Sequence, residues 1–186
     1  MPEAALDDLI TLARASVEQA QLHEPGHVIR LESREESIQG FWDGDRLAQV
    51  FANLLGNAVK CSPAGGEIVV RIQDLGAKVR VSITDHGVGI AADALPRIFD
   101  QFYRVGAVVN DVPGLGLGLH VSKTLVGAHG GSIWVQSDPG AGSTFTFEIP
   151  CVAPAPSEKR NARTKRNASG SRAANAQLEA HAELEF

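Results

Sequence analysis

The stretch Asp111-Val112-Pro113-Gly114-Leu115-Gly116-Leu117-Gly118-Leu119 carries the strongest signal in the chain. Three glycines at alternate positions allow the backbone to approach a ligand without an intervening Cβ, and to turn its N–H groups toward one anion. The apolar run that follows has helical spacing, and a helix N-terminus favours negative charge. The pattern favours a phosphate-binding loop that leads into a helix. A flexible turn before a helix is the alternative.

A second glycine-containing turn lies upstream. Asp85 ends an alternating β run, and Gly87 and Gly89 follow it. A carboxylate at a strand end can accept a hydrogen bond from a buried amino group, such as the exocyclic amine of a purine. An Asp-initiated turn is the plainer interpretation. Between the two glycine turns, the segment 97–104 carries aromatic residues three and four apart and ends at Arg104.

An amphipathic helix is predicted over 45–60. Its apolar stripe has helical spacing and consists of Leu47, Val50, Phe51, Leu54 and Ala58. On another face, Asn53, Asn57 and Lys60 stand at i, i+4 and i+7. Because Asn is a mediocre helix former, this pattern suggests a task other than helix stability. A carboxamide oxygen can bind Mg²⁺ and a Lys can meet a phosphate, whereas a solvated helix face is the alternative.

Four short motifs occur in an order that resembles one family. They are Asn53…Asn57…Lys60, Asp85-x-Gly87-x-Gly89, Phe99-x-x-Phe102-x-Arg104 and Gly114-x-Gly116-x-Gly118. This series is similar to the N, G1, F and G2 boxes of the catalytic and ATP-binding domain of bacterial sensor histidine kinases. That domain belongs to the wider ATPase superfamily that includes gyrase B, Hsp90 and MutL. The resemblance runs from about residue 4 to residue 150.

The resemblance implies a role for each motif residue. Asn57 would hold the Mg²⁺ that bridges the phosphates of ATP, Asn53 would support the geometry of phosphate and metal, and Lys60 and Arg104 would neutralise phosphate charge. Asp85 would receive the adenine amine. The remaining implied contacts are Gly87 and Gly89 beside the base, Gly114, Gly116, Gly118 and Leu119 along the triphosphate, and Thr144 as a direct or water-mediated partner of Asp85. Cys61 replaces an aromatic residue or His that commonly packs near the base.

Asn53 also bears on the reaction. Hydrolysing members of the superfamily place a Glu one turn before the Mg²⁺ asparagine, where it can deprotonate water. An amide cannot act as that base, whereas a neutral histidine imidazole needs no strong base to attack the γ-phosphate. The resemblance therefore implies phosphoryl transfer to histidine in two-component signalling. A nucleotide-binding regulatory module without kinase activity and a weak ATPase are the alternatives.

The phosphoacceptor histidine is not recognised in this chain. Sensor kinases carry it inside a long helix of a dimerisation hairpin, whereas His23 stands in a Pro-Gly loop. We expect all six histidines to be structural or exposed; they are His23, His27, His86, His120, His129 and His181. The expected partners are a histidine-containing dimerisation domain, in cis in a longer protein or in trans, and a cognate response regulator.

Composition limits the class of protein. With 186 residues and 44% hydrophobic content, the chain allows one domain with a tail, expected as a catalytic domain over 1–150 and a largely disordered basic tail over 151–186. A net charge of −5 does not suggest a nucleic-acid partner. Cys61 and Cys151 match neither a zinc site nor a disulfide framework. No apolar run reaches membrane-spanning length, so we expect a cytoplasmic domain, including the cytoplasmic part of a membrane-bound sensor.

The periodicities predict an α/β fold, a two-layer sandwich of a mixed sheet with three main helices on one face, as in the Bergerat-type ATP-binding fold that the resemblance implies. Helices are expected over 4–21, from an Asp43 or Asp45 cap to before Ser62, and over 115–128, with a short helical segment over 92–99. Strands are expected over 27–32, 37–41, 67–74, 78–85, 132–137 and 143–149. The stretch 106–113 is expected to be a mobile lid.

Overall fold

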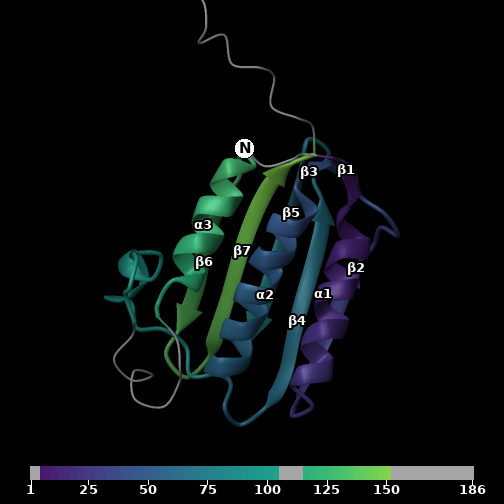
Figure 1. The fold of residues 1–186 in the computed structure, drawn as a ribbon. Coiled ribbons are helices and arrows are strands. Elements are labelled where there is room, and N and C mark those ends of the chain that lie inside the picture. The colour runs from purple at the N-terminus through teal and green to yellow at the C-terminus, as the bar shows by residue number, and fades with distance from the viewer. Residues whose placement is uncertain (1–4, 105–114, 152–186) are drawn as a thin grey trace, which may run out of the picture. The chain divides into compact units, whose positions relative to one another are not determined.

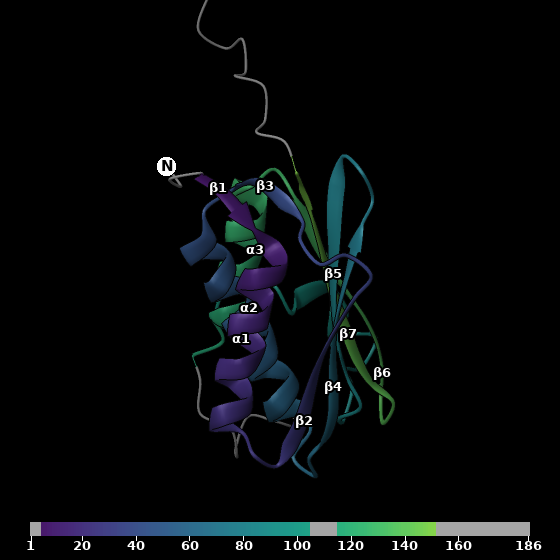
Figure 2. The ribbon, with the colours of Figure 1, turned by 90° about the vertical axis from the view of Figure 1, so that its right-hand side faces the viewer.

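The computed structural model describes residues 5–104 and 115–151. In Figure 1 three helices lie in front of a five-stranded sheet, and Figure 2 shows the same two layers from the side. The predicted fold class is confirmed. The expected lid over 106–113 and all but the first residue of the expected tail lie outside the described residues.

The main sheet has the strand order β2-β4-β5-β7-β6. Its strands are β2 (His27–Ser33), β4 (Gly66–Asp74), β5 (Lys78–Asp85), β6 (Ser132–Asp138) and β7 (Gly142–Pro150). β2 and β4 are parallel, whereas the other three pairings are antiparallel. The sheet is therefore mixed, as predicted, and its strands begin and end within a few residues of the expected bounds.

The N-terminal region differs from the prediction of one helix over 4–21. Residues 5–8 form β1 (Ala5–Asp8), which pairs antiparallel with β3 (Gln39–Trp42) in a separate two-stranded sheet. The helix α1 (Leu9–His23) begins after Asp8, whose carboxylate accepts the N–H of Ile10 and the hydroxyl of Thr11. Leu6, within the predicted helix, lies in β1 and is 59% exposed.

The helix α2 (Gly44–Cys61) supplies the centre of the core. Asp43 caps it by accepting the N–H of Arg46, which decides between the two predicted caps. Its apolar stripe is at most 1% exposed and consists, as predicted, of Leu47, Val50, Phe51, Leu54 and Ala58. The Phe51 ring meets the ring of Phe147 on β7 edge to face, with the centroids 5.8 Å apart. This packing fixes α2 on the inner face of the sheet.

The helix α3 (Gly118–Ala128) is tied to α2 at both ends. Near its C-terminus, Nε2 of His129 accepts the backbone N–H of Asp43, and Nδ1 donates to the carbonyl of Leu125. At its N-terminus, the amide nitrogen of Asn53 donates to the carbonyl of Gly118. The two helices therefore run antiparallel. The expected helical start at residue 115 is three residues early, and the segment expected over 92–99 contains only the 3₁₀ turn η1 (Leu95–Arg97).

Phe147→Ala is expected to lower the free energy of unfolding by about 3–5 kcal/mol, because it opens a cavity between α2 and the sheet. The control is Phe41→Ala, since Phe41 is 49% exposed and its loss is expected to cost less than about 1 kcal/mol. Urea titration measures both values. Equal losses for the two variants would show that the core is not centred where we place it.

Candidate functional site

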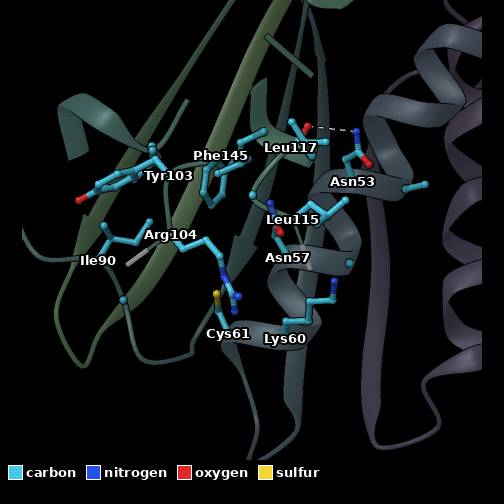
Figure 3. A pocket seen from close by; sticks show the side chains of 17 residues that line it. Asn53, Asn57, Lys60, Cys61, Ile90, Tyr103, Arg104, Leu115, Leu117 and Phe145 are labelled. Carbon is cyan, nitrogen blue, oxygen red and sulfur yellow. Dashed lines mark hydrogen bonds between the residues drawn. The ribbon is translucent and has the colours of Figure 1, made fainter. Parts of the chain in front are cut away.

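One pocket lies where α2, the segment 98–104 and the loop before α3 meet. Its volume is about 570 Å³, within the range of small-molecule sites. Figure 3 shows its side chains. The lining residues are Ala52, Asn53, Gly56, Asn57, Lys60, Cys61, Gly89, Ile90, Ile98, Tyr103, Arg104, Leu115, Gly116, Leu117, Gly118, Leu119 and Phe145. The structure thus brings together residues from all four motifs.

The polar side of the pocket is the predicted face of α2. Asn53, Asn57 and Lys60 lie along it in three successive turns (Figure 3). Among the described residues, the side chain of Asn57 makes no hydrogen bond and that of Lys60 makes no ion pair, so both are available to a ligand. The amide nitrogen of Asn53 is already used by Gly118 and by the hydroxyl of Ser122, which leaves its Oδ1.

The charged side chains that line the pocket are positive. Lys60 and Arg104 both contribute to it, and none of the described lining residues is an Asp or Glu. α3 begins at Gly118, and no side chain among the described residues caps it, so the first N–H groups of the helix are available in this region. Two cations and a helix N-terminus favour an anionic ligand. Of the residues that the resemblance places along the triphosphate, Gly116, Gly118 and Leu119 line this pocket, and Gly114 lies outside the described residues.

The opposite side of the pocket is apolar. In Figure 3, Ile90 and Tyr103 lie across from the polar face of α2, with Phe145 between them and Asn53. A pocket with a cationic and an apolar end fits a ligand with an anionic and a flat apolar part. The apolar lining residues Ile90, Ile98 and Phe145 were not identified in the sequence, because apolar residues at strand ends and in short turns carry no signal that separates lining from core.

Asp85 lies at the end of β5 and is 1% exposed, but it does not line the pocket. Burial raises the pKa of its carboxyl group, an effect that the backbone N–H groups of Gly87 and Ser143 partly offset. The N–H of Gly87 donates to Oδ1 of Asp85 at 2.9 Å. Cys61, which does line the pocket, has a thiol whose pKa is raised by burial and also by the nearby charge of Asp85. Asp85 is therefore close to the pocket wall but behind it.

Gly87 and Gly89 are required by the chain's own backbone. A Cβ on Gly87 would fall 1.9 Å from the carbonyl oxygen of Cys61. Gly89 has a φ of +69°, and a Cβ there would fall 2.0 Å from the carbonyl oxygen of Asp138. The resemblance implied that these glycines make room for a base. In the structure Gly89 lines the pocket and Gly87 does not, and both allow close packing of the turn after β5.

Thr144 is not a partner of Asp85, which corrects the prediction. Its hydroxyl lies 3.1 Å from that of Thr84, its cross-strand neighbour. Because side chains alternate along a strand, this places Thr144 on the sheet face opposite to Asp85. The backbone N–H of the preceding residue, Ser143, acts on the Asp85 carboxylate instead.

Ser122 is a site residue that sequence reasoning missed. It is fully buried in α3, its hydroxyl donates to the Gly118 carbonyl at 2.9 Å, and it lies 3.2 Å from the amide nitrogen of Asn53. The available signal was a polar residue one turn after Gly118 within an apolar run. Ser122 supports the position of Asn53.

Among the described residues, no group of three or more His, Cys, Asp or Glu could hold a metal ion by itself. No helix in the described part of the chain is both long and apolar enough to cross a membrane.

Residues 42–153 match the family model for the histidine kinase-, DNA gyrase B- and HSP90-like ATPases. The chain belongs to this family. It is 40% identical over 111 residues to the sensor histidine kinase WalK of Bacillus subtilis, which covers 58% of this chain and 18% of WalK. It is 45% identical over 108 residues to ZraS of Escherichia coli, covering 58% of this chain and 22% of ZraS. The chain spans about a fifth of these relatives.

Solved structures place this ATPase domain with the catalytic domains of histidine kinases. The catalytic domain of ThkA superposes with a TM-score of 0.72 at 28% identity, covering 81% of this chain and 97% of that one. Full-length ShkA in complex with AMPPNP gives a TM-score of 0.71 at 34% identity, covering 84% of this chain and 33% of ShkA. The sequence-based recognition of a sensor histidine kinase catalytic domain is confirmed.

Asp85→Asn is expected to change the pH dependence of stability in the nucleotide-free domain. Because the pKa of Asp85 is raised in the folded state, its stabilising contribution is complete below the ordinary carboxyl pKa of about 3.9 and is lost as the pH rises through the raised value. The Asn variant carries no charge and can still accept the N–H of Gly87. It should therefore gain stability relative to the wild type between about pH 4 and pH 7.

Urea titrations of both proteins across this range measure the difference. The exposed Asp93 provides the control, since Asp93→Asn should change the free energy of unfolding by less than about 0.5 kcal/mol. A wild type that gains stability over Asp85→Asn as the pH rises would contradict the assignment.

Proposed function

We propose that this domain binds ATP together with Mg²⁺ and donates the γ-phosphoryl group to a histidine of a dimerisation domain, within a two-component signalling pathway. The observation that carries the proposal is the lining of the pocket. It combines Lys60, Arg104 and the N-terminus of α3 with no described acidic residue. An anionic ligand would be attracted to such a lining.

Each end of the pocket suits one part of ATP. The triphosphate would lie between Lys60, Arg104 and the backbone of Gly116 and Gly118, and the adenine would lie toward the apolar side at Ile90. The buried carboxylate of Asp85 remains the group that we propose to accept the adenine amine. AMPPNP, an ATP analogue, is bound in the structure of ShkA, which has the same fold.

The donors at the polar end also fit Mg²⁺. The amide oxygen of Asn57 is a hard ligand, and its side chain makes no hydrogen bond among the described residues. No described cluster of acidic residues competes for the ion, so phosphate oxygens and water would supply most of its ligands. Bound there, Mg²⁺ would neutralise phosphate charge. Asn57 would hold it in place, and Asn53 would present Oδ1 to the same region.

The residues around the phosphates favour transfer to histidine. No described lining residue is a carboxylate, and Asn53 cannot deprotonate a water or a serine hydroxyl. A neutral imidazole brings its own lone pair, so the task of the domain reduces to positioning and charge stabilisation by Lys60 and Arg104.

Each histidine in the described part of the chain makes a hydrogen bond within the fold, which supports an acceptor in a separate domain. His27 and His129 are buried, with ring nitrogens bonded to the carbonyl groups of Ser62 and Leu125. The ring of His120 contacts the carbonyl of Phe99 and the side chain of Gln101. His23, which was predicted to lie in a loop, is the last residue of α1; it is exposed, and its ring bonds to the carbonyl of Gln19 in the same helix.

Isothermal calorimetry is expected to show ATP binding that Mg²⁺ strengthens. Asn57→Ala should remove the part of the affinity that depends on Mg²⁺, and Lys60→Ala should weaken binding about tenfold or more through the loss of a charge-assisted contact. Gln49→Ala, on α2 but outside this pocket, is the matched control and should bind as the wild type does. Unchanged binding in both site variants would refute the nucleotide site.

Phosphoryl transfer is expected only in trans. With radiolabelled ATP, the chain alone should take up no acid-labile label, whereas addition of a dimerisation hairpin from a sensor kinase should place label on the hairpin. Lys60→Ala should slow that transfer. Label on the isolated chain that disappears in His23→Gln would show instead that the chain carries its own acceptor.

A further inference from the structure

His120 joins α3 to the segment that carries Arg104. It stands two residues after Gly118, in the first turn of α3, and does not line the pocket. Its Nδ1 lies 3.1 Å from the carbonyl oxygen of Phe99, and its Nε2 lies 3.1 Å from the side-chain nitrogen of Gln101. The ring therefore bridges two parts of the chain that are about twenty residues apart.

The partners of the ring define which ring nitrogen donates. A carbonyl oxygen only accepts hydrogen bonds, so Nδ1 of His120 donates to the Phe99 carbonyl. Nε2 then accepts from the side-chain amide of Gln101, so both ring nitrogens are hydrogen-bonded. We call these two hydrogen bonds the His120 bridge.

The segment on the far side of the bridge has a disfavoured conformation. Phe102 has a φ of 61°, and no other non-glycine residue in the described part of the chain has a positive φ. A bulky L-residue rarely adopts this conformation unless its surroundings impose it. Packing does not impose it here, because Phe102 is 68% exposed. Two sets of hydrogen bonds constrain the segment instead. The His120 bridge holds the carbonyl of Phe99 and the side chain of Gln101, and the N–H of Phe102 donates to the Gly116 carbonyl.

The position of Arg104 depends on this conformation. Arg104 follows Phe102 by two residues, and in Figure 3 its side chain reaches toward Cys61 at the C-terminal end of α2. The first turn of α3 is itself held on α2 by Asn53. Through the bridge, the backbone before Arg104 is therefore fixed relative to the same helix that carries Asn57 and Lys60.

We propose that His120 is a positioning residue for nucleotide binding, which sets Arg104 at the phosphate end of the pocket by holding the Phe99 and Gln101 turn on α3. This inference rests on the proposed function. It assigns His120 no contact with the nucleotide and no proton transfer.

A double-mutant cycle tests the proposal, with ATP affinity in Mg²⁺ measured by calorimetry. His120→Ala should weaken binding about fivefold, because it removes both hydrogen bonds of the His120 bridge. In an Arg104→Ala background the same substitution should have almost no further effect, because its effect passes through Arg104. In a Lys60→Ala background the fivefold loss should persist. Thr124→Ala, which removes an exposed hydroxyl bonded only within α3, is the control and should leave binding unchanged.

Rescue by a conservative variant separates positioning from general damage to the fold. The amide of His120→Asn can replace Nδ1 as the donor to Phe99, so this variant should recover most of the ATP affinity, whereas His120→Leu should not. Gln101→Ala removes the second hydrogen bond and should give a smaller loss. The His120→Asn and Gln101→Ala variants keep the test decisive if His120→Ala does not fold.

Equal losses from His120→Ala with and without Arg104, or an Asn variant as weak as the Leu variant, would overturn the proposal while leaving ATP binding intact. A wild-type chain that binds no ATP would overturn the proposed function and, with it, this inference.

Discussion

The amide of Asn53 is the contact on which the pocket depends. It donates to the carbonyl of Gly118 at 3.1 Å and lies 3.2 Å from the hydroxyl of Ser122, one turn further along α3. Together with the bond from Asp43 to His129 at the other end, it fixes the position of α3 along α2. The glycine loop before α3 then faces the polar side of α2. One residue thus serves both the fold and the site, because Oδ1 of Asn53 is left for a ligand.

The parts of the fold that periodicity determines could be predicted from the sequence. The apolar stripe of α2 and the alternation in β5 each repeat over several turns or residues, and both are found as expected. The N-terminal helix was predicted too long, because apolar spacing continues from Leu6 into α1. The contacts that make α1 begin after Asp8 are only partly local. Besides the N–H of Ile10, the carboxylate of Asp8 accepts the N–H of Ile38, thirty residues away. Such a bond leaves no pattern near Asp8.

The site residues that local periodicity determines could also be predicted, whereas those that depend on contacts between elements could not. Helical spacing was enough to place Asn53, Asn57 and Lys60 on one face of α2. Strand alternation could have excluded Thr144, since Phe145 beside it lines the pocket and neighbouring side chains point to opposite faces. The contacts of Ser122 and His120 cross between elements, so their roles follow only from the packing of α3. The same packing positions Gly116 and Gly118 at the pocket.

Hydrogen exchange at the N-terminus of α3 tests most directly whether Asn53 builds the site. The N–H of Val121 donates to the carbonyl of Leu117 in the first turn of α3 and reports on that turn. If the Asn53 amide holds the turn on α2, Asn53→Ala should speed exchange at Val121 about tenfold, whereas the buried amide of Ile83 in β5 should exchange at its wild-type rate. Equal exchange at Val121 in the two proteins would contradict this role of Asn53.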